Sequence, residues 1–328
     1  MTLNVHYLSE LDSQIADYLS AQLDPAVRLT SGEKSAKSGD IHILVSGRPD
    51  RDLLLANDDL KMLIVPWTGI PPETRDLLAD FPRIALHNLH HNATPVAEMA
   101  AALLLAAAKN LIPMDQALRK GDWRLRYQKP APSLTLNNRT ALILGYGEIG
   151  RRVARICKSM GMNVIATRRS AAPGDSDEIA DEIYPPQKLN DLLPRAQTLI
   201  VALPLTPETE GLIGDRELAL LPPESVLVNI GRARIVDEEA LFKALKNRAL
   251  GAAGLDVWYS YPEDEQSRAS TFPAEYPFWE LENVVMSPHR AGLTREIEHL
   301  RMDHLAVLLN AAARNERVSN LVDINLGY

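Results

Sequence analysis

The sequence predicts an α/β protein with parallel, doubly wound sheets. Short apolar runs alternate with helical patterns along most of the 328 residues, as in consecutive βαβ units. One of these runs, 141–144, passes directly into a glycine-rich turn and then into a helical pattern, which is typical of a phosphate-binding turn. The length is sufficient for two domains, each with its own hydrophobic core.

Composition and charge narrow the function classes. The chain is 46% hydrophobic with a formal net charge of −8, which argues against general affinity for nucleic acid or membrane surfaces. Its single cysteine, Cys157, cannot form an intramolecular disulfide, as is typical of a reducing compartment. The N-terminus lacks the pattern of a secretory signal, and the longest apolar run, 100–108, is too short to span a bilayer. We therefore expect a cytoplasmic protein.

The first ninety residues are expected to form a small α/β unit. Pro66 and Pro71 bound a loop that exposes backbone N–H groups at the carboxyl end of a strand, where open α/β sheets bind ligands. The predicted elements are strands at 5–8, 41–45, 61–65 and 84–86, and a helix at 11–23.

The remaining residues predict a longer series of alternating elements. Thr94 as N-cap and Pro95 at the first helical position start an apolar helix that continues to residue 108, the first crossover. A returning helix is expected at 294–314. Between them we expect strands at 141–144, 163–166, 198–202, 226–229, 252–257 and 284–286, and helices at 148–160, 188–193, 215–220 and 237–247.

The glycine-rich turn has the spacing of a dinucleotide-binding site. Gly145 allows the tight turn, Gly147 lets a pyrophosphate approach the backbone, and Gly150 lets the helix pack close to its strand. The phosphates would lie on the N–H groups at the helix start, near Glu148 and Ile149. The alternative is an ordinary glycine turn without a ligand.

The end of the strand at 163–166 indicates which dinucleotide is bound. An NAD site usually has a carboxylate there for the ribose hydroxyls, whereas a 2′-phosphate is held by arginine. Here Arg168 and Arg169 follow the strand, and no acidic residue lies between Gly150 and Asp175. Guanidinium groups suit phosphate oxygens, so we expect NADP(H), with NAD(H) as the other cofactor. The alternative is a pair of solvated surface arginines.

Two further strand ends carry side chains that suit hydride-transfer chemistry. Arg232 follows the strand at 226–229 and His289 follows the strand at 284–286. A guanidinium can bind the carboxylate of a 2-keto acid and polarise its carbonyl, and an imidazole can exchange the hydroxyl proton near neutral pH. Taken singly, each residue is also consistent with a structural role.

A series of motifs identifies a family resemblance. The sequences GYGEIG, LPLTPET, LVNIGRARIVDEEAL, GLDV and SPHRAG occur in that order between residues 145 and 292, and NATPVAE precedes them at 92–98. Together they resemble the D-isomer-specific 2-hydroxyacid dehydrogenases. The resemblance covers almost the whole chain and does not specify a substrate.

The resemblance implies two Rossmann-like domains and usually a homodimer. A cofactor domain at 100–292 would be inserted into a discontinuous substrate domain at 1–99 and 293–328. It also implies roles for individual positions, stated here by residue number. In the substrate site, Arg232 resembles the substrate-orienting arginine, His289 resembles the acid/base histidine, and Gly69 and Ile70 resemble the carboxylate-binding amides. In the cofactor site, Asp256 resembles the nicotinamide contact, Ile149 resembles part of the pyrophosphate loop, and Arg168 takes the place of the ribose aspartate. The nicotinamide-side wall would be formed by Leu203, Pro204, Ile230 and Gly231.

One position departs from the family pattern. The glutamate expected five residues after the GLDV aspartate, paired to the catalytic histidine, is Tyr261 here. A tyrosine is neutral at pH 7 and offers only a hydrogen bond, so the pKa of His289 should be lower than beside a carboxylate. Glu263, Asp264 or Glu265 could replace the missing carboxylate, the alternative being solvated loop acids.

Four further arginines and a group of three histidines each have two possible interpretations. Arg234, Arg290, Arg124 and Arg126 favour a substrate with a second anionic group, and ion pairs with Asp237 or Glu239 are the alternative. His87, His90 and His91 are interpreted as lining of a substrate pocket rather than as a zinc site, because no acidic or thiol ligand accompanies them. We expect no metal.

The combined hypothesis is an NADP(H)-preferring D-2-hydroxyacid dehydrogenase or 2-ketoacid reductase acting on a small anionic substrate. Arg232, His289 and Tyr261 would form its catalytic group. An anion dehydrogenase acting on formate or phosphite is the first alternative, since formate dehydrogenases of this family also lack the glutamate. A cofactor-sensing protein resembling the family's corepressors is the second.

Overall fold

A computed structural model describes residues 2–33, 40–172 and 175–324, and contacts divide the chain into two compact units. Unit 1 comprises Met1–Asn92 and Leu293–Tyr328, and unit 2 comprises Ala93–Gly292. The first boundary thus precedes the expected one at 99/100. The physical reason is that helix α4 (Ala93–Ala108) packs along its length on other elements of unit 2.

Unit 1 is built on a parallel five-stranded sheet in the order β2-β1-β3-β4-β5. The chain adds β2 on one side of β1 and β3 on the other, so the strand order reverses at β1. The elements are β1 (Leu3–Tyr7), α1 (Ser13–Ser20), β2 (Val27–Ser31), β3 (Ile43–Val45), α2 (Arg51–Leu55), β4 (Met62–Val65), α3 (Pro72–Leu78), β5 (Ala85–Asn88) and α11 (Ile297–Ala313).

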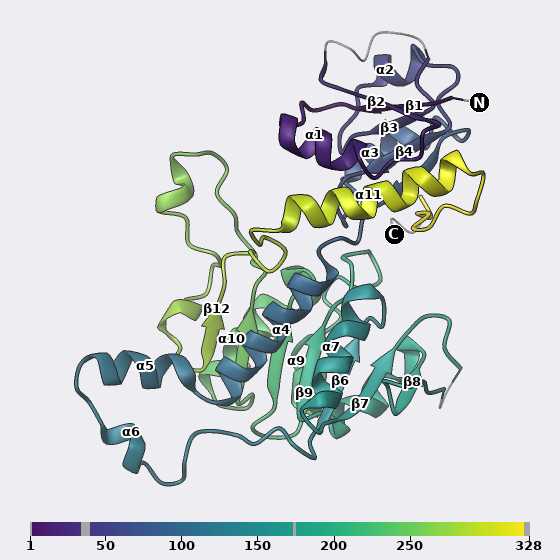
Figure 1. Ribbon diagram of the computed structural model, residues 1–328. Helices are drawn as coiled ribbons and strands as arrows, with labels where there is room; N and C mark the ends of the chain where they lie inside the picture. Colours follow the sequence, from purple (N-terminus) through teal and green to yellow (C-terminus); the bar gives the residue numbers. More distant parts are fainter. Residues whose placement is uncertain (1, 34–39, 173–174, 325–328) are drawn as a thin grey trace. The chain divides into compact units, whose positions relative to one another are not determined.

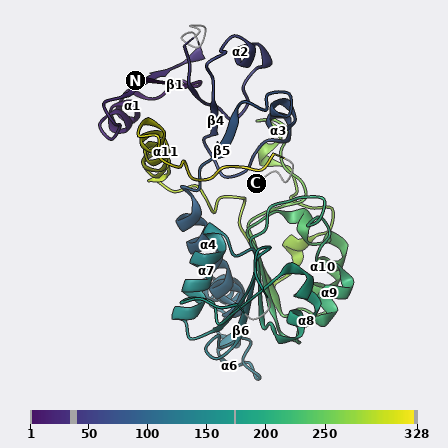
Figure 2. The ribbon, with the colours of Figure 1, turned by 90° about the vertical axis from the view of Figure 1, so that its right-hand side faces the viewer.

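Both faces of this sheet are covered by helices. Ile43 and Val45 belong to the apolar cluster that contains residues of α1 and α11, whereas Leu44 belongs to the cluster with residues of α2 and α3. Figure 2 shows these two pairs of helices on opposite sides of the strands. The alternation follows from the two-residue period of a strand whose faces are both buried.

Unit 2 is built on a parallel seven-stranded sheet in the order β12-β11-β10-β9-β6-β7-β8. The order reverses between β6 and β9, which places the turn after β6 at the topological switch point. The elements are α4, α5 (Leu111–Arg119), α6 (Arg124–Tyr127), β6 (Thr140–Leu144), α7 (Glu148–Ser159), β7 (Asn163–Thr167), β8 (Glu182–Tyr184), α8 (Leu189–Leu192), β9 (Thr198–Val201), α9 (Asp215–Leu220), β10 (Val226–Asn229), α10 (Glu238–Lys246), β11 (Ala252–Leu255) and β12 (Val284–Met286).

The expected α/β class with two parallel, doubly wound sheets is confirmed. Helices α4 and α7 cover one face of the larger sheet, and α8, α9 and α10 cover the other (Figure 2). Along β6, Ala141 and Ile143 face the first layer while Leu142 and Leu144 face the second. The unbroken apolar sequence of this strand is explained by burial on both sides.

Helix α4 lies beside α7 (Figure 1) and against β11, where Gly254 permits close contact. A Cβ at Gly254 would lie 2.8 Å from the Cβ of Leu103. The helix begins at Ala93, so the expectation that Thr94 is the N-cap is wrong: Thr94 lies in the first turn, where its hydroxyl accepts a bond from Arg152. Among the described residues, no single helix has the length and hydropathy of a membrane span; α4 and α5 pass that test together, with a 66° bend between them.

Several elements were not expected from the sequence. They include the edge strands β2 and β8 and the helices α2, α3, α5 and α6. In β2 the residues are half-buried or exposed, and α5 has no buried residue, so neither shows the apolar signal of a core element. Strand β2 and helix α5 therefore have little burial to leave a pattern in the sequence, whereas α2, α3 and β8 are short elements with few buried residues, such as Leu54, Leu78 and Ile183.

Candidate active site in unit 2

The glycine turn after β6 has the geometry expected of a dinucleotide-binding turn. Gly145 has φ +93°, and a Cβ there would lie 2.7 Å from the carbonyl oxygen of Ala202. A Cβ at Gly150 would lie 1.9 Å from the carbonyl oxygen of Gly145, so helix and turn are in contact. A larger residue at either position would displace backbone atoms.

The middle glycine of the turn differs from the other two. A Cβ at Gly147 would meet no described atom within 4 Å, so the backbone is open on this side. Gly147 directly precedes Glu148 and Ile149, the first residues of α7, whose N–H groups have no partner within the helix. An open glycine before the amino end of a twelve-residue helix fits the pyrophosphate of a dinucleotide.

Arg168 lies at the carboxyl end of β7, beside this turn. Thr167 links the two segments, because its carbonyl oxygen accepts the Tyr146 N–H at 3.0 Å. The Nε atom of Arg168 is buried and has no hydrogen-bond partner among the described residues. A buried guanidinium N–H without an acceptor is costly, and a phosphate oxygen would satisfy it.

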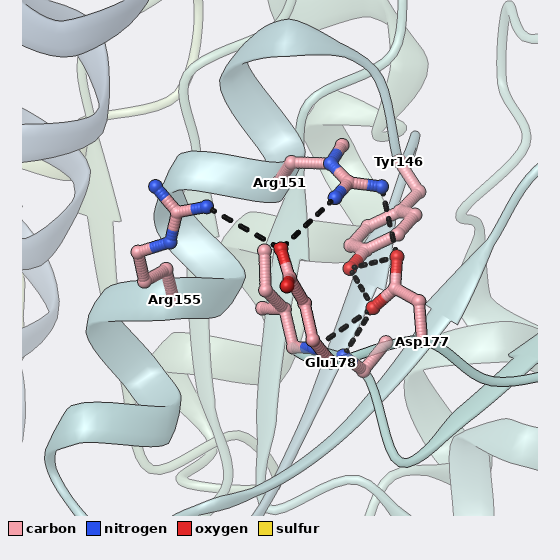
Figure 3. A network of polar contacts seen from close by, with 7 residues as sticks. Tyr146, Arg151, Arg155, Asp177 and Glu178 are labelled. Atoms are coloured by element: carbon pink, nitrogen blue, oxygen red, sulfur yellow. Dashed lines mark hydrogen bonds and ion pairs between the residues drawn. The ribbon is translucent and has the colours of Figure 1, made fainter.

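A polar network anchors the segment that follows Arg168 and Arg169 (Figure 3). The hydroxyl of Tyr146, in the glycine turn, donates to Asp177 at 2.9 Å, and Arg151 of α7 donates to the same carboxylate at 2.8 Å. Glu178 lies 3.9 Å from Arg151. Because Asp177 is bound from both the turn and the helix, this residue is fixed relative to the glycine turn.

The turn after β10 holds Arg232 at the edge of the sheet. The Asn229 side chain accepts the Gly231 N–H at 3.1 Å and donates to the carbonyl oxygen of Arg232 at 3.0 Å. The guanidinium of Arg232 donates to the Gly231 carbonyl at 2.7 Å, and the residue is exposed. Asn229 therefore shapes the turn while most of the guanidinium donors stay available to a ligand.

The expected nicotinamide-side wall is formed by two adjoining turns. A Cβ at Gly231 would lie 2.6 Å from the carbonyl oxygen of Leu203, so the turns after β9 and β10 are in direct contact. Leu203 and Pro204 are half-buried and Ile230 is buried. The structure thus brings these four residues together, and their contact with a nicotinamide stays a prediction.

The turn after β12 is held by Asp256, at the end of β11. This buried carboxylate accepts hydrogen bonds from the Ser287 hydroxyl at 2.6 Å and from the backbone N–H groups of Arg290 and Ala291, each at 3.0 Å. Between these anchors His289 adopts φ 54°, a conformation uncommon for a residue with a Cβ. The described contacts of Asp256 all support the histidine turn; its contact with a nicotinamide stays a prediction.

Tyr261 contacts the imidazole of His289, as the missing glutamate would. The Tyr261 oxygen lies 3.0 Å from Nδ1 of His289 and accepts the Trp258 N–H at 3.1 Å. The rings are 5.6 Å apart between centroids. The indole N–H of Trp258 donates to the carbonyl oxygen of Ser287 at 2.8 Å, which fixes the tyrosine-bearing segment to the histidine turn.

The electrostatic surroundings favour the neutral imidazole. Partial loss of hydration and, secondly, the positive charge of Arg232 lower the pKa of His289, and Asp256 opposes them. Burial raises the pKa of Tyr261, while the Trp258 N–H and Arg232 lower it. Because β10, β11 and β12 are neighbouring parallel strands, their carboxyl ends place Arg232, Tyr261 and His289 at one edge of the sheet.

The loop acids do not replace the missing carboxylate. Asp264 accepts the Ser267 N–H at 2.7 Å, and Glu265 pairs with Arg268 at 3.2 Å. Among the described contacts of the His289 ring, the hydrogen bond goes to Tyr261. The suggestion that Glu263, Asp264 or Glu265 pairs with this histidine is therefore wrong.

Two of the four additional arginines, Arg124 and Arg234, form ion pairs. Arg124 forms a close pair with Asp122, and Arg234 lies 3.5 Å from Glu210 rather than near Asp237 or Glu239. Ion pairing thus accounts for Arg124 and Arg234, with a partner for Arg234 that the sequence did not indicate.

In unit 1, Gly69 and Ile70 lie in the turn after β4. The Thr68 hydroxyl of this turn donates to Asn92 at 2.6 Å, so the turn is tied to the segment after β5. The role of Gly69 and Ile70 as carboxylate-binding amides stays a prediction.

The three neighbouring histidines have separate surroundings. His87 bonds the Ser319 carbonyl through Nδ1 at 2.7 Å, and the backbone N–H of His90 donates to His304. Nδ1 of His91 is buried without a hydrogen-bond partner in the part of the chain described. No group of three or more His, Cys, Asp or Glu that could hold a metal is present within the described ranges.

Sequence reasoning missed the residues that support the site. Asn229, Ser287, Trp258 and Asp177 hold the turns through hydrogen bonds. Asn229 is the last residue of β10, and Ser287 is the first residue after β12. A polar residue at the end of a buried strand could have identified both of them from the sequence. Asp177 lies in an irregular loop, and nothing in the local sequence pointed to its partners.

Comparison with known proteins agrees with this geometry. A family model described as the NAD-binding domain of D-isomer specific 2-hydroxyacid dehydrogenases matches residues 101–291. A glyoxylate reductase of Thermococcus gammatolerans is 38% identical over 207 residues, 62% of this chain and 58% of the relative. The chain therefore aligns with less than two thirds of that relative's length. A glyoxylate reductase of Thermococcus litoralis is 30% identical over 290 residues, 85% of this chain and 82% of the relative.

A solved structure shows the same fold. It is a D-isomer specific 2-hydroxyacid dehydrogenase of Xanthobacter autotrophicus in complex with NADPH and MES, with a TM-score of 0.79, 23% identity and full coverage of both chains. Unit 2, with its glycine turn at the switch point, is thus a nicotinamide-nucleotide-binding domain. The chain belongs to the D-isomer specific 2-hydroxyacid dehydrogenase family.

Proposed function

We propose that the protein is an NADP(H)-preferring D-2-hydroxyacid dehydrogenase or 2-ketoacid reductase of the glyoxylate or hydroxypyruvate reductase kind. The observation that carries the proposal is the placement of Arg232, Tyr261 and His289 at the carboxyl edge of the sheet that bears the glycine turn. The glyoxylate reductase relatives support this substrate class.

The side chains suit the two demands of the reaction. A bound nicotinamide nucleotide supplies or accepts the hydride. Arg232 would bind the substrate carboxylate and stabilise the negative charge that develops on the C2 oxygen. His289 would exchange the proton of that oxygen.

The preference for NADP(H) rests on Arg168. Its buried Nε lacks a partner among the described atoms, and no carboxylate occupies the end of β7. A 2′-phosphate would supply charged acceptors for this guanidinium, whereas a ribose hydroxyl is a neutral and weaker acceptor. The NADPH-bound neighbour is in agreement. A kcat/KM for NADH above that for NADPH would contradict the preference.

The decisive experiment follows NADPH absorbance during incubation with a panel of 2-keto acids that includes glyoxylate, hydroxypyruvate, pyruvate and oxaloacetate. We expect oxidation with at least one of them, and none with a His289→Asn variant that still binds NADPH. If the wild-type chain binds NADPH but oxidises it with no keto acid, the cofactor-sensing alternative is favoured. NADP⁺ reduction by formate or phosphite alone would favour the anion dehydrogenase.

The assembly and location are proposed on separate observations. A homodimer is supported by large apolar side chains that α5 and α6 expose, such as Leu118 and Tyr127, since these helices project from the sheet (Figure 1). Light scattering of the purified chain tests it. The cytoplasm is the proposed location, supported by the free thiol of Cys157.

A further inference from the structure

The hydroxyl of Tyr261 has two defined neighbours, the Trp258 backbone N–H and the imidazole of His289. The Trp258 backbone N–H can only donate, so at 3.1 Å the tyrosine oxygen is the acceptor. The phenol has one hydrogen, and the second neighbour, at 3.0 Å, is Nδ1 of His289. Donation of that hydrogen to Nδ1 satisfies both contacts.

Donation from Tyr261 to Nδ1 corresponds to one tautomer of His289. A neutral imidazole carries one N–H, and an Nδ1 that accepts from Tyr261 places the hydrogen on Nε2. The charged groups that act on this ring are Arg232, after β10, and Asp256, after β11. Asp256 is already bound by the Ser287 hydroxyl and two backbone N–H groups, so it is not available to the ring.

We propose that Tyr261 and His289 form a proton relay, in which Tyr261 is the source of the proton that reaches the substrate oxygen. The proposal rests on the 2-ketoacid reductase function proposed above. As C2 receives a hydride from a reduced nicotinamide nucleotide, the carbonyl electron pair moves to oxygen, which takes the proton from Nε2. Nδ1 takes the proton of the Tyr261 hydroxyl at the same time. The imidazole remains neutral as the other tautomer, and Tyr261 becomes a phenolate.

The surroundings of Tyr261 suit a transient phenolate. Burial raises the pKa of Tyr261, but its oxygen would accept hydrogen bonds from the Trp258 N–H and from the newly protonated Nδ1, and the positive charge of Arg232 also favours the phenolate. Tyr261 is 47% exposed, so water can return the proton. A phenol is a stronger acid than the alcohol product, so the net transfer is downhill.

The relay gives an unusual pH dependence. A histidine that acts alone must be imidazolium to protonate the product, so the reduction rate falls above the pKa of the histidine. With the relay, neutral His289 is also active, and the rate is maintained until Tyr261 itself ionises. Tyr261 is thus a positioning residue that acts through His289 and also supplies it with a proton.

The test measures single-turnover NADPH oxidation against pH in the wild type and in Tyr261→Phe. We expect a flat wild-type profile from about pH 6 to 9, and a Tyr261→Phe rate that is near normal at about pH 5.5 but about 100-fold lower at pH 8.5. Tyr259→Phe is the matched control, because the Tyr259 hydroxyl donates to the Val236 carbonyl at 2.8 Å and should leave the wild-type profile unchanged. A Tyr261→Phe profile parallel to wild type at all pH values overturns the relay.

A second measurement does not depend on activity. Nitrogen-15 NMR of the protein without cofactor, with His289 assigned by His289→Gln, reports which ring nitrogen carries the hydrogen. Protonated Nε2 in the wild type supports the relay; protonated Nδ1 in the wild type overturns it. Failure of the wild type to reduce any keto acid contradicts the proposed function instead, so the two failures are distinguishable.

Discussion

The carboxyl edges of the two sheets are organised in different ways. In unit 2 the polar groups at the strand ends are bonded to one another, as Asp256 shows by accepting three hydrogen bonds from the histidine turn. In unit 1, buried polar atoms lack partners among the described residues, such as Nδ1 of His91 and Nε of Arg301. The turn that carries the unit 2 histidine is held by a carboxylate, whereas the unit 1 edge combines a hydrogen-bonded turn at Thr68 with buried groups that lack partners among the described residues.

The contrast shows that a lowered pKa does not by itself identify a catalytic histidine. Burial and then the positive charge of Arg301 lower the pKa of His91 to about 4, and partial desolvation also lowers the pKa of His289. Only His289 is exposed, carries a hydroxyl on Nδ1 and stands in a turn fixed by a carboxylate. Geometry that can move a proton, rather than the direction of the shift, separates the two.

The largest expected effect tests this contrast directly. His289→Asn should lower kcat by about 10³-fold, because the group that protonates the product is lost. His91→Asn should change kcat by less than about 3-fold, because His91 takes no part in the proton transfer. Steady-state kinetics give kcat for both variants, and NADPH binding shows that each variant is folded. Equal losses in kcat would remove the distinction between the two edges.

Arg168 is the exception within the ordered edge of unit 2, and its removal should sharpen the comparison. If the guanidinium of Arg168 binds the 2′-phosphate, Arg168→Met should raise KM for NADPH by about 30-fold and leave KM for NADH within about 3-fold of the wild-type value. Arg155→Met, on the outer side of α7 near Glu178, is the matched control and should alter neither value. Equal changes for both nucleotides would show a structural role for Arg168.

The sequence predicted the pre-organised edge well, because its chemistry is encoded in strand ends and glycine spacing. Gly145 and Gly150 make the tight turn and the close helix contact expected, and Gly147 leaves its backbone open, while its contact with a pyrophosphate stays a prediction. Arg232 and His289 come to one edge because parallel neighbours end together. The hydrogen-bond partners were not predictable to the same extent. The bonds of Asp256 to Arg290 and Ala291 join residues more than 30 positions apart.

The mistaken expectations have a common physical origin. Thr94 has the residue type of an N-cap, but α4, which packs on other elements of unit 2, begins at Ala93, two residues before the expected first helical position at Pro95. Asp264 has the charge to replace the missing glutamate, but the local Ser267 N–H binds it first. In both cases the outcome is decided by a contact that the spacing and composition of the sequence do not record.

A third test uses the unsatisfied edge of unit 1 through stability. The pKa of His91 is about 4 when folded and near the ordinary value of 6.5 when unfolded. The unfolded chain therefore binds more protons between these values, so the free energy of unfolding is highest above about pH 6.5 and falls as pH decreases toward 4. We expect this loss to be about 2 kcal/mol after allowance for partial exposure, and His91→Gln to remove most of it.

Chemical denaturation of wild type and His91→Gln at several pH values between about 4 and 7 measures the difference. His289→Gln is the control for a histidine that is more exposed. Identical pH dependence in wild type and His91→Gln would contradict the assignment of the acid loss to His91.

The smallest effect concerns the partner of His289. Tyr261→Glu would place a carboxylate beside Nδ1, stabilise the imidazolium and raise the pKa of His289 by about one unit or more. Tyr261→Gln adds a neutral partner of the same length and should leave that pKa near the wild-type value. The ring C–H chemical shifts of His289 against pH give the pKa in each variant. An unchanged pKa of His289 in Tyr261→Glu would mean that Tyr261 does not occupy the position of a paired acid. The difference in pKa between His289 and His91 would then have to arise from burial and from the neighbouring arginines.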